Sequence, residues 1–235
     1  MRWAAGIVGL AALFAQGAAA EITGARYIGP TEAYGHGAVA GGEYAGLMIE
    51  TSDGPFLWGV TEHVFEDTAP RLVDLDGDDT PEIVIVASFF DAGAAIQIID
   101  EQRDGFAIVA QTDPIGRRHR WLAIAGIADL DGDGFMEIAY VDRPHLAKVL
   151  RVIEVGPDFT LRDEAAASGF TNHHLGSAVS EGGIIDGGQG PEILTADADW
   201  RRVLATRLDG HALVSRDLGR YSGPASLEHC HEAEQ

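Results

Sequence analysis

Two acidic stretches of nine residues decide the fold of this chain: DLDGDDTPE at positions 74–82 and DLDGDGFME at positions 129–137. A short apolar run follows each stretch, at residues 83–86 and 138–141. Carboxylates occupy positions 1, 3, 5 and 9 of both stretches. Two such charges about 4 Å apart repel by ~4 kcal/mol at an effective dielectric constant of about 20, so we expect a cation in each loop.

The oxygen ligands at alternate positions, with a main-chain carbonyl at position 7, favour Ca²⁺ over the smaller and more strictly octahedral Mg²⁺. An EF-hand loop needs glycine at position 6 and glutamate at position 12. The first stretch has Asp79 at position 6, and position 12 is Ile85 or Tyr140, so the EF-hand is excluded. The alternative is a pair of Asp/Gly hairpin turns with solvated carboxylates, and two copies in matching context argue against it. The expected calcium ligands are Asp74, Asp76, Asp78, Thr80 and Glu82 in the first loop, and Asp129, Asp131, Asp133, Phe135 and Glu137 in the second.

The two loops belong to a longer repeat, because 55 residues separate Asp74 from Asp129 and Glu82 from Glu137. A further 55 residues lead to Glu192, at the end of the stretch IIDGGQGPE. This third loop keeps acidic residues at positions 3 and 9 but lacks them at positions 1 and 5, so we expect no metal there. Residues 36–50 form a shortened fourth copy with a glycine turn in place of the loop. Four repeats of about 50 residues, rich in short strands, are typical of propeller blades.

The pattern Asp-x-Asp-Gly-Asp-x-x-x-Glu followed by a strand resembles the FG-GAP or VCBS repeat of integrin α-chains and of many secreted bacterial proteins. The resemblance covers about residues 31–220 and is most specific at the two acidic loops. It implies calcium-binding propeller blades, with the loop carboxylates as ligands. The sequence departs from the family in having glutamate at position 9 and Asp79 in place of glycine.

The expected fold is all-β, a small β-propeller with four blades of four antiparallel strands. Alternating or β-branched runs between Gly/Asp turns predict the strands. They are expected at residues 71–74, 82–88, 94–100 and 106–111 in the second repeat, at 123–129, 137–141, 148–155 and 159–162 in the third, and at 177–185, 192–196, 202–208 and 212–216 in the fourth. Residues 164–168 are expected to form at most one helical turn. Residues 22–28 are a candidate outer strand that pairs with the last blade and closes the ring; an open array and a ring shared by two chains are the alternatives.

The chain is expected to divide into three segments. Residues 1–20 have the basic start, apolar run and small-residue end of a secretory signal peptide. Residues 21–220 form a single propeller domain, and residues 221–235, which contain the single cysteine, Cys230, form a C-terminal tail. We therefore expect a periplasmic or secreted monomer without membrane insertion. The formal net charge of −21 makes nucleic acid and anionic membranes poor partners.

A candidate ligand-binding surface is expected on the face opposite the acidic loops, where the linkers and the turns between the second and third strands of each blade gather. Arginines are concentrated there in an otherwise acidic chain, which favours an anionic group because guanidinium matches carboxylate or phosphate. The alternatives are packing and salt bridges between blades, or a transition metal held by the histidines. The candidate ligand-binding residues are His36, Arg118, Arg120, Trp121, Asn172 and His173.

Two classes of function remain open. The first is a calcium-stabilised binding or scaffold module for a small anionic molecule, a glycan or a protein. The second is a periplasmic hydrolase or lyase that uses the His/Arg/Asp cluster for acid–base work. The sequence has no nucleophile elbow, phosphate loop or metalloprotease motif. We therefore prefer the binding class and assign no catalytic residue.

Overall fold

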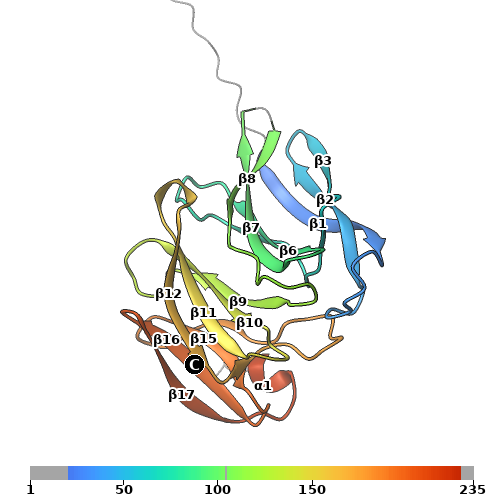
Figure 1. The fold of residues 1–235 in the computed structure, drawn as a ribbon. Helices are drawn as coiled ribbons and strands as arrows, with labels where there is room; N and C mark the ends of the chain where they lie inside the picture. Colours follow the sequence, from blue (N-terminus) through green and yellow to red (C-terminus); the bar gives the residue numbers. More distant parts are fainter. Residues whose placement is uncertain (1–20, 104, 229–235) are drawn as a thin grey trace, which may run out of the picture.

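The computed structural model describes residues 21–103 and 105–228, and these residues form an all-β fold, as expected (Figure 1). The expected signal peptide and residues 229–235 of the expected tail lie outside the described residues. The elements within them are β1 (Ile22–Thr31), β2 (Glu43–Thr51), β3 (Gly54–Gly59), β4 (His63–Phe65), β5 (Arg71–Val73), β6 (Glu82–Phe89), β7 (Gly93–Gln102), β8 (Gly105–Gln111), β9 (Leu122–Ala128), β10 (Met136–Asp142), β11 (Val149–Val155), η1 (Pro157–Phe159), β12 (Leu161–Ser168), β13 (Phe170–Thr171), β14 (Gly183–Asp186), β15 (Pro191–Asp197), β16 (Arg202–Asp209), β17 (Ala212–Arg220) and α1 (Ala225–Glu228).

The strands make several antiparallel sheets, one of which forms half a barrel. The largest has eight strands, with the path β1-β2-β4-β6-β7-β8, to which β3 adds beside β2 and β5 beside β6. The second has the order β12-β11-β10-β9, and the third has the order β13-β15-β16-β17 with β14 also beside β15. Strands β5–β8, β9–β12 and β14–β17 thus follow one another as three antiparallel meanders. Most lie close to the strand ranges expected for the second, third and fourth repeats, but β14 begins six residues after the expected start at 177, and β12 extends six residues beyond the expected end at 162.

The first repeat departs from the expected pattern. It supplies β1, β2 and β3, and its sheet continues into the second repeat because β4 pairs with both β2 and β6. Strand β1, whose first seven residues were expected to pair with the last repeat, pairs instead with β2, from Ile22 opposite Thr51 to Thr31 opposite Glu43. That prediction was wrong because alternation of polar and apolar residues marks a strand without identifying its partner. A hairpin partner nearby in the sequence costs less chain entropy than a distant one.

Residues 164–168, for which at most one helical turn was expected, form no helical turn and lie in β12. Ala165 and Ala167 lie opposite Val152 and Leu150 of β11, and both alanines pack against the buried residues between the second and third sheets. Sheet pairing overrides the high helix propensity of alanine here.

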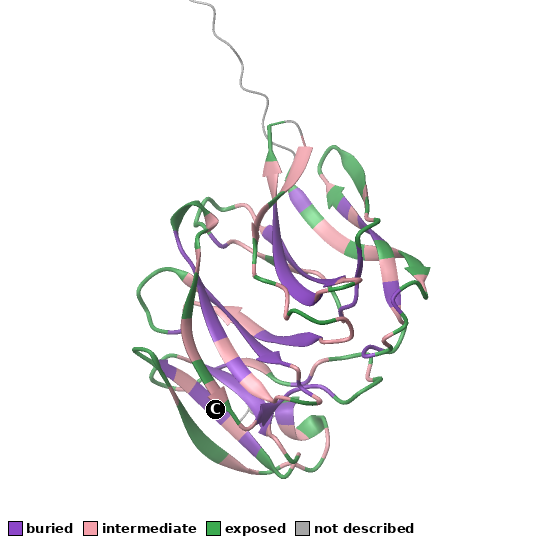
Figure 2. Cartoon of the chain, in the orientation of Figure 1, coloured by how far each residue is buried: buried purple, intermediate pink, exposed green. Residues whose placement is uncertain are grey.

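Two hydrophobic cores lie between consecutive sheets. One core joins β6 and β7 to β9, β10 and β11, and it includes Trp121 and Leu122. The next joins β10 and β11 to β15 and β16, through residues such as Val141, Leu150 and Ile193. Figure 2 shows the buried residues along the inner strands, whereas the outer strand β17 is largely exposed. Apolar contacts thus join neighbouring sheets, and further buried clusters lie within the first sheet and between the third sheet and α1.

The first and fourth repeats meet through loops. Gly176 donates its main-chain N–H to the Ala38 carbonyl (2.8 Å), and Ala40 donates to the Ser177 carbonyl (2.9 Å). Val39 and Ser177 form a parallel bridge. The first and fourth repeats thus contact each other through loops, and no described strand of one of these repeats joins the sheet of the other. Among the described residues, no helix is long and apolar enough to cross a membrane.

Candidate metal loops and the opposite face

The first acidic loop joins β5 to β6 and is wound around its own carboxylates. Asp74 accepts hydrogen bonds from the main-chain N–H of Gly77 (2.7 Å) and Asp79 (3.1 Å), and Asp78 accepts one from Thr80 (2.8 Å). One carboxylate oxygen from each of Asp74, Asp76 and Asp78 lies within 4.8 Å of the others. The loop therefore gathers its negative charge at one point.

The second acidic loop, between β9 and β10, has the same internal bonds at the same distances. Asp129 accepts from Gly132 (2.7 Å) and Gly134 (3.1 Å), and Asp133 accepts from Phe135 (2.8 Å). Here oxygens of Asp129, Asp131 and Glu137 lie within 4.8 Å of one another. Two loops 55 residues apart thus adopt one geometry despite different residues at positions 6, 7 and 8.

The glutamate at position 9 of each loop is buried at the start of the following strand. Glu82 accepts from the Leu75 N–H (2.6 Å), and Glu137 accepts from the Leu130 N–H (2.5 Å). The pKa of both carboxyls is raised to about 7, chiefly by burial and also by the neighbouring aspartates, while the hydrogen bond from Leu75 or Leu130 acts in the opposite direction. The cost of charging these groups is what a cation among the carboxylates would offset.

The corresponding glutamate of the fourth repeat has a different environment. Glu192 is buried and binds the Arg216 guanidinium of β17 through contacts of 2.5 to 3.1 Å. Asp186 accepts from the Gly188 N–H (2.9 Å), and its pairing with Pro191 continues the β14–β15 ladder into the loop. The chain supplies a positive charge of its own at this position, consistent with the expected absence of a metal.

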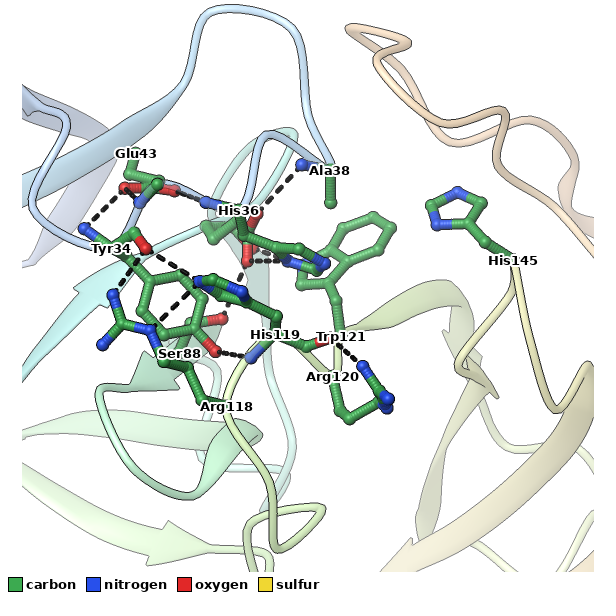
Figure 3. A network of polar contacts seen from close by, with 12 residues as sticks. Tyr34, His36, Ala38, Glu43, Ser88, Arg118, His119, Arg120, Trp121 and His145 are labelled. Carbon is green, nitrogen blue, oxygen red and sulfur yellow. Dashed lines mark hydrogen bonds and ion pairs between the residues drawn. The ribbon is translucent and has the colours of Figure 1, made fainter.

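On the opposite face, two buried glutamates hold the segment that leads into β2 (Figure 3). Glu43 accepts from the main-chain N–H groups of Tyr34, Gly35 and His36 at 2.8 to 3.0 Å. Glu66 accepts from the Ala38 N–H (3.1 Å) and the Ser88 hydroxyl (3.1 Å), and its carboxylate lies 3.0 Å from His36 Nδ1. Glu43 and Tyr34 were not among the sequence candidates; a glutamate at the start of an apolar strand was the available signal.

Arg118 and Arg120 belong to the linker before β9, which packs against the start of β7. Ala94 donates to the Arg120 carbonyl (2.8 Å), and a Cβ at Gly93 would lie 2.3 Å from the Arg117 carbonyl oxygen, so glycine is required there. Arg118 donates to the carbonyls of Phe90 (3.0 Å) and Tyr34 (2.7 Å). Arg120 donates to the His119 carbonyl (2.8 Å). Arg118 thus ties the first repeat to this linker through main-chain oxygens.

The remaining candidates lie deeper. Trp121 is 2% exposed and donates its indole N–H to the Glu66 carbonyl (2.6 Å). Asn172 and His173 are fully buried: Asn172 donates to the carbonyls of Ala123 and Ile124, and the His173 ring packs on Trp121 with centroids 4.7 Å apart. The structure therefore brings His36, Trp121 and His173 into one connected group around Glu66. The buried members of this group fit the packing interpretation better than direct ligand contact.

The His36 and His119 rings are stacked, with centroids 5.1 Å apart and planes 4° from parallel. His145 Nε2 lies 3.1 Å from His173 Nδ1. Within the part of the chain that the structure describes, the groups with three or more possible metal ligands are those of the two acidic loops. The histidines therefore do not form a preorganised transition-metal site there.

No protein-family model matches the chain, and no curated protein sequence is significantly similar to it.

Proposed function

We propose that the chain is an exported calcium-binding β-propeller of the FG-GAP/VCBS type that acts as a binding or scaffold module. The observation that carries the proposal is the pair of acidic loops, which share one hydrogen-bond geometry and direct their carboxylates inward. The loop's own hydrogen bonds hold these carboxylates close together, so they repel one another. A hard divalent cation with irregular coordination relieves that repulsion.

The proposed calcium ligands are the carboxylates at positions 1, 3, 5 and 9 of each loop and the main-chain carbonyl at position 7. Each ion would offset part of the negative charge of the four carboxylates in its loop. It would also offset part of the free-energy cost of burying a charged Glu82 or Glu137. The proposed ring consists of four repeats in one chain. Cores between neighbouring sheets and the loop contact between the first and fourth repeats support a monomer.

Calorimetric titration of Ca²⁺ into metal-free protein tests the proposal. We expect two ions per chain for the wild type and one for Asp76→Asn or Asp131→Asn. Asp186→Asn is the matched control and should retain two, because its loop has Ile184 and Gly188 at positions 1 and 5. At a calcium concentration 100 times Kd, each site should add ~2.7 kcal/mol to the free energy of unfolding. A wild-type chain that takes up no calcium refutes the assignment.

A second candidate function, an exported hydrolase or lyase, is favoured by one contact. The buried Glu66 carboxylate lies 3.0 Å from His36 Nδ1, the arrangement that orients an imidazole so that its other nitrogen can accept a proton. A panel of chromogenic esters and glycosides tests this alternative. Turnover that His36→Gln abolishes, and that the exposed control His211→Gln leaves unchanged, favours the enzyme; no turnover on any substrate removes it.

A further inference from the structure

A cavity lies between the third and fourth repeats, on the side of the acidic loops. Its volume is about 730 Å³, within the usual range for small-ligand pockets. One wall is the second acidic loop, with Leu130, Asp131 and Gly132, and the other is formed by β16 and β17. The fourth repeat's own loop, residues 187–192, forms the remaining part.

The cavity borders the loop of the fourth repeat, which has glycine at two positions where the third repeat has larger side chains. Gly188 stands where the third repeat has Asp133, and Gly190 where it has Phe135. With no side chains at these two positions, the loop lines the cavity with its main chain, and Gly188 and Gly190 have φ of 74° and 124°. Their left-handed conformation disfavours any larger residue that would fill the space.

The polar groups of the lining are mostly paired. The Arg207 guanidinium lies 2.8 Å from Asp209, and Arg216 binds Glu192. Gln189 and Ser215 add an amide and a hydroxyl. The lining therefore contains both donors and acceptors, with three carboxylates against two guanidinium groups. It has no excess of positive charge that would attract an anion.

A ligand for such a cavity needs many groups that both donate and accept hydrogen bonds, and no net charge. Sugar hydroxyls meet both requirements, since each has one donor and two acceptor positions. The apolar side chains of Leu130, Leu208 and Val214 also line the cavity and suit the C–H faces of a sugar ring.

We propose that this cavity binds a neutral glycan. The inference rests on the proposed role of the chain as a binding module and specifies its ligand class and its site. Arg207, with five N–H donors of which Asp209 engages one, would bind ring or hydroxyl oxygens at one end of the cavity. Asp131, an expected calcium ligand, would meet the ligand at the other end.

An array of immobilised neutral and acidic oligosaccharides, probed with the mature chain in calcium, tests the proposal. Val214→Trp blocks the cavity from an exposed position of β17, and Arg207→Gln removes the charged donor with little expected cost in stability, because its ion pair is exposed. We expect neutral glycans to bind, and both variants to weaken binding at least tenfold. Val179→Trp and Arg26→Gln, at exposed sites elsewhere, are the matched controls and should bind as the wild type does.

Three results would overturn the inference: no neutral glycan is retained, acidic glycans alone are retained, or Val214→Trp and Arg207→Gln both bind normally. Circular dichroism establishes that each variant is folded. Calcium stoichiometry, measured on the same samples, separates this inference from the proposed calcium sites. Two bound ions without a glycan would refute the cavity alone, and a glycan without calcium would refute the calcium assignment alone.

Discussion

The buried ion pair between Asp67 and Arg71 should be among the most costly polar contacts to break. Asp67 is 3% exposed and accepts from the Arg71 guanidinium (2.5 Å), the Tyr27 hydroxyl (2.9 Å) and the N–H groups of Thr68 (2.7 Å) and Val86 (3.2 Å). These bonds link β1 to β5 and β6. Arg71→Met keeps most of the aliphatic stem and removes the positive charge, which leaves a buried carboxylate without its counter-charge.

Removing one partner of a buried pair costs about 3–5 kcal/mol, and the three remaining donors to Asp67 favour the lower end, ~3 kcal/mol. For a chain of this size that corresponds to a fall in Tm of roughly 6–12 °C. Urea unfolding at pH 7 in saturating calcium measures the change. The exposed pair of Arg202 and Asp217 is the control: its two contacts are also short, 2.7 Å each, but Arg202→Met should cost far less than Arg71→Met because water screens the pair. Equal losses for Arg71→Met and Arg202→Met would refute the argument from burial.

Two further predictions concern pH and backbone strain. Burial lowers the pKa of His63 to about 4, so between that pH and about 6.5 the unfolded chain binds more protons than the folded chain. The free energy of unfolding should therefore fall as the pH is lowered through this range, by up to ~3 kcal/mol from this residue. His63→Phe should remove this contribution to the pH dependence. It should cost little stability at pH 7, because His63 packs between Phe65 and Phe89 and its Nε2 is buried without a partner. If urea unfolding gave the variant the same pH profile as the wild type, this prediction would be contradicted. Asp79 has a φ of 70°, in the left-handed region that favours glycine, and the second loop has Gly134 at this position. Asp79→Gly should therefore stabilise the chain by up to ~1 kcal/mol. A lower Tm for this variant in calcium would contradict the strain argument.

Local sequence patterns were sufficient to predict most strands of three repeats and the positions of the two acidic loops. The Asp/Gly turns mark where the chain direction reverses, and each turn depends on residues close together in the sequence. The convergence of Asp74, Asp76 and Asp78 follows from the loop's own hydrogen bonds, so it too is local.

Longer-range features were not predictable in the same way. The pairing of β1 with β2 depends on competition between partners, which the alternation of side chains does not encode. Arg118 belongs to a basic cluster in the sequence, but its guanidinium binds main-chain carbonyls of Phe90 and Tyr34, and any exposed carbonyl pair would have satisfied it equally. Main-chain carbonyl partners of this kind can be identified only from the packed structure, because they come from distant parts of the sequence.

The contact between Ala38–Ala40 and Gly176–Ser177 has a mechanical consequence. The strands within each sheet are joined in register over several residues, so pulling along a sheet must shear many bonds together. The first and fourth repeats meet through two main-chain hydrogen bonds of loops and a short bridge. A force that pulls Val39 away from Ser177 acts on these bonds directly, whereas a ladder such as that of β16 and β17 shares its load over many residue pairs. We therefore expect such a force to open this seam before it separates the long ladders within the sheets.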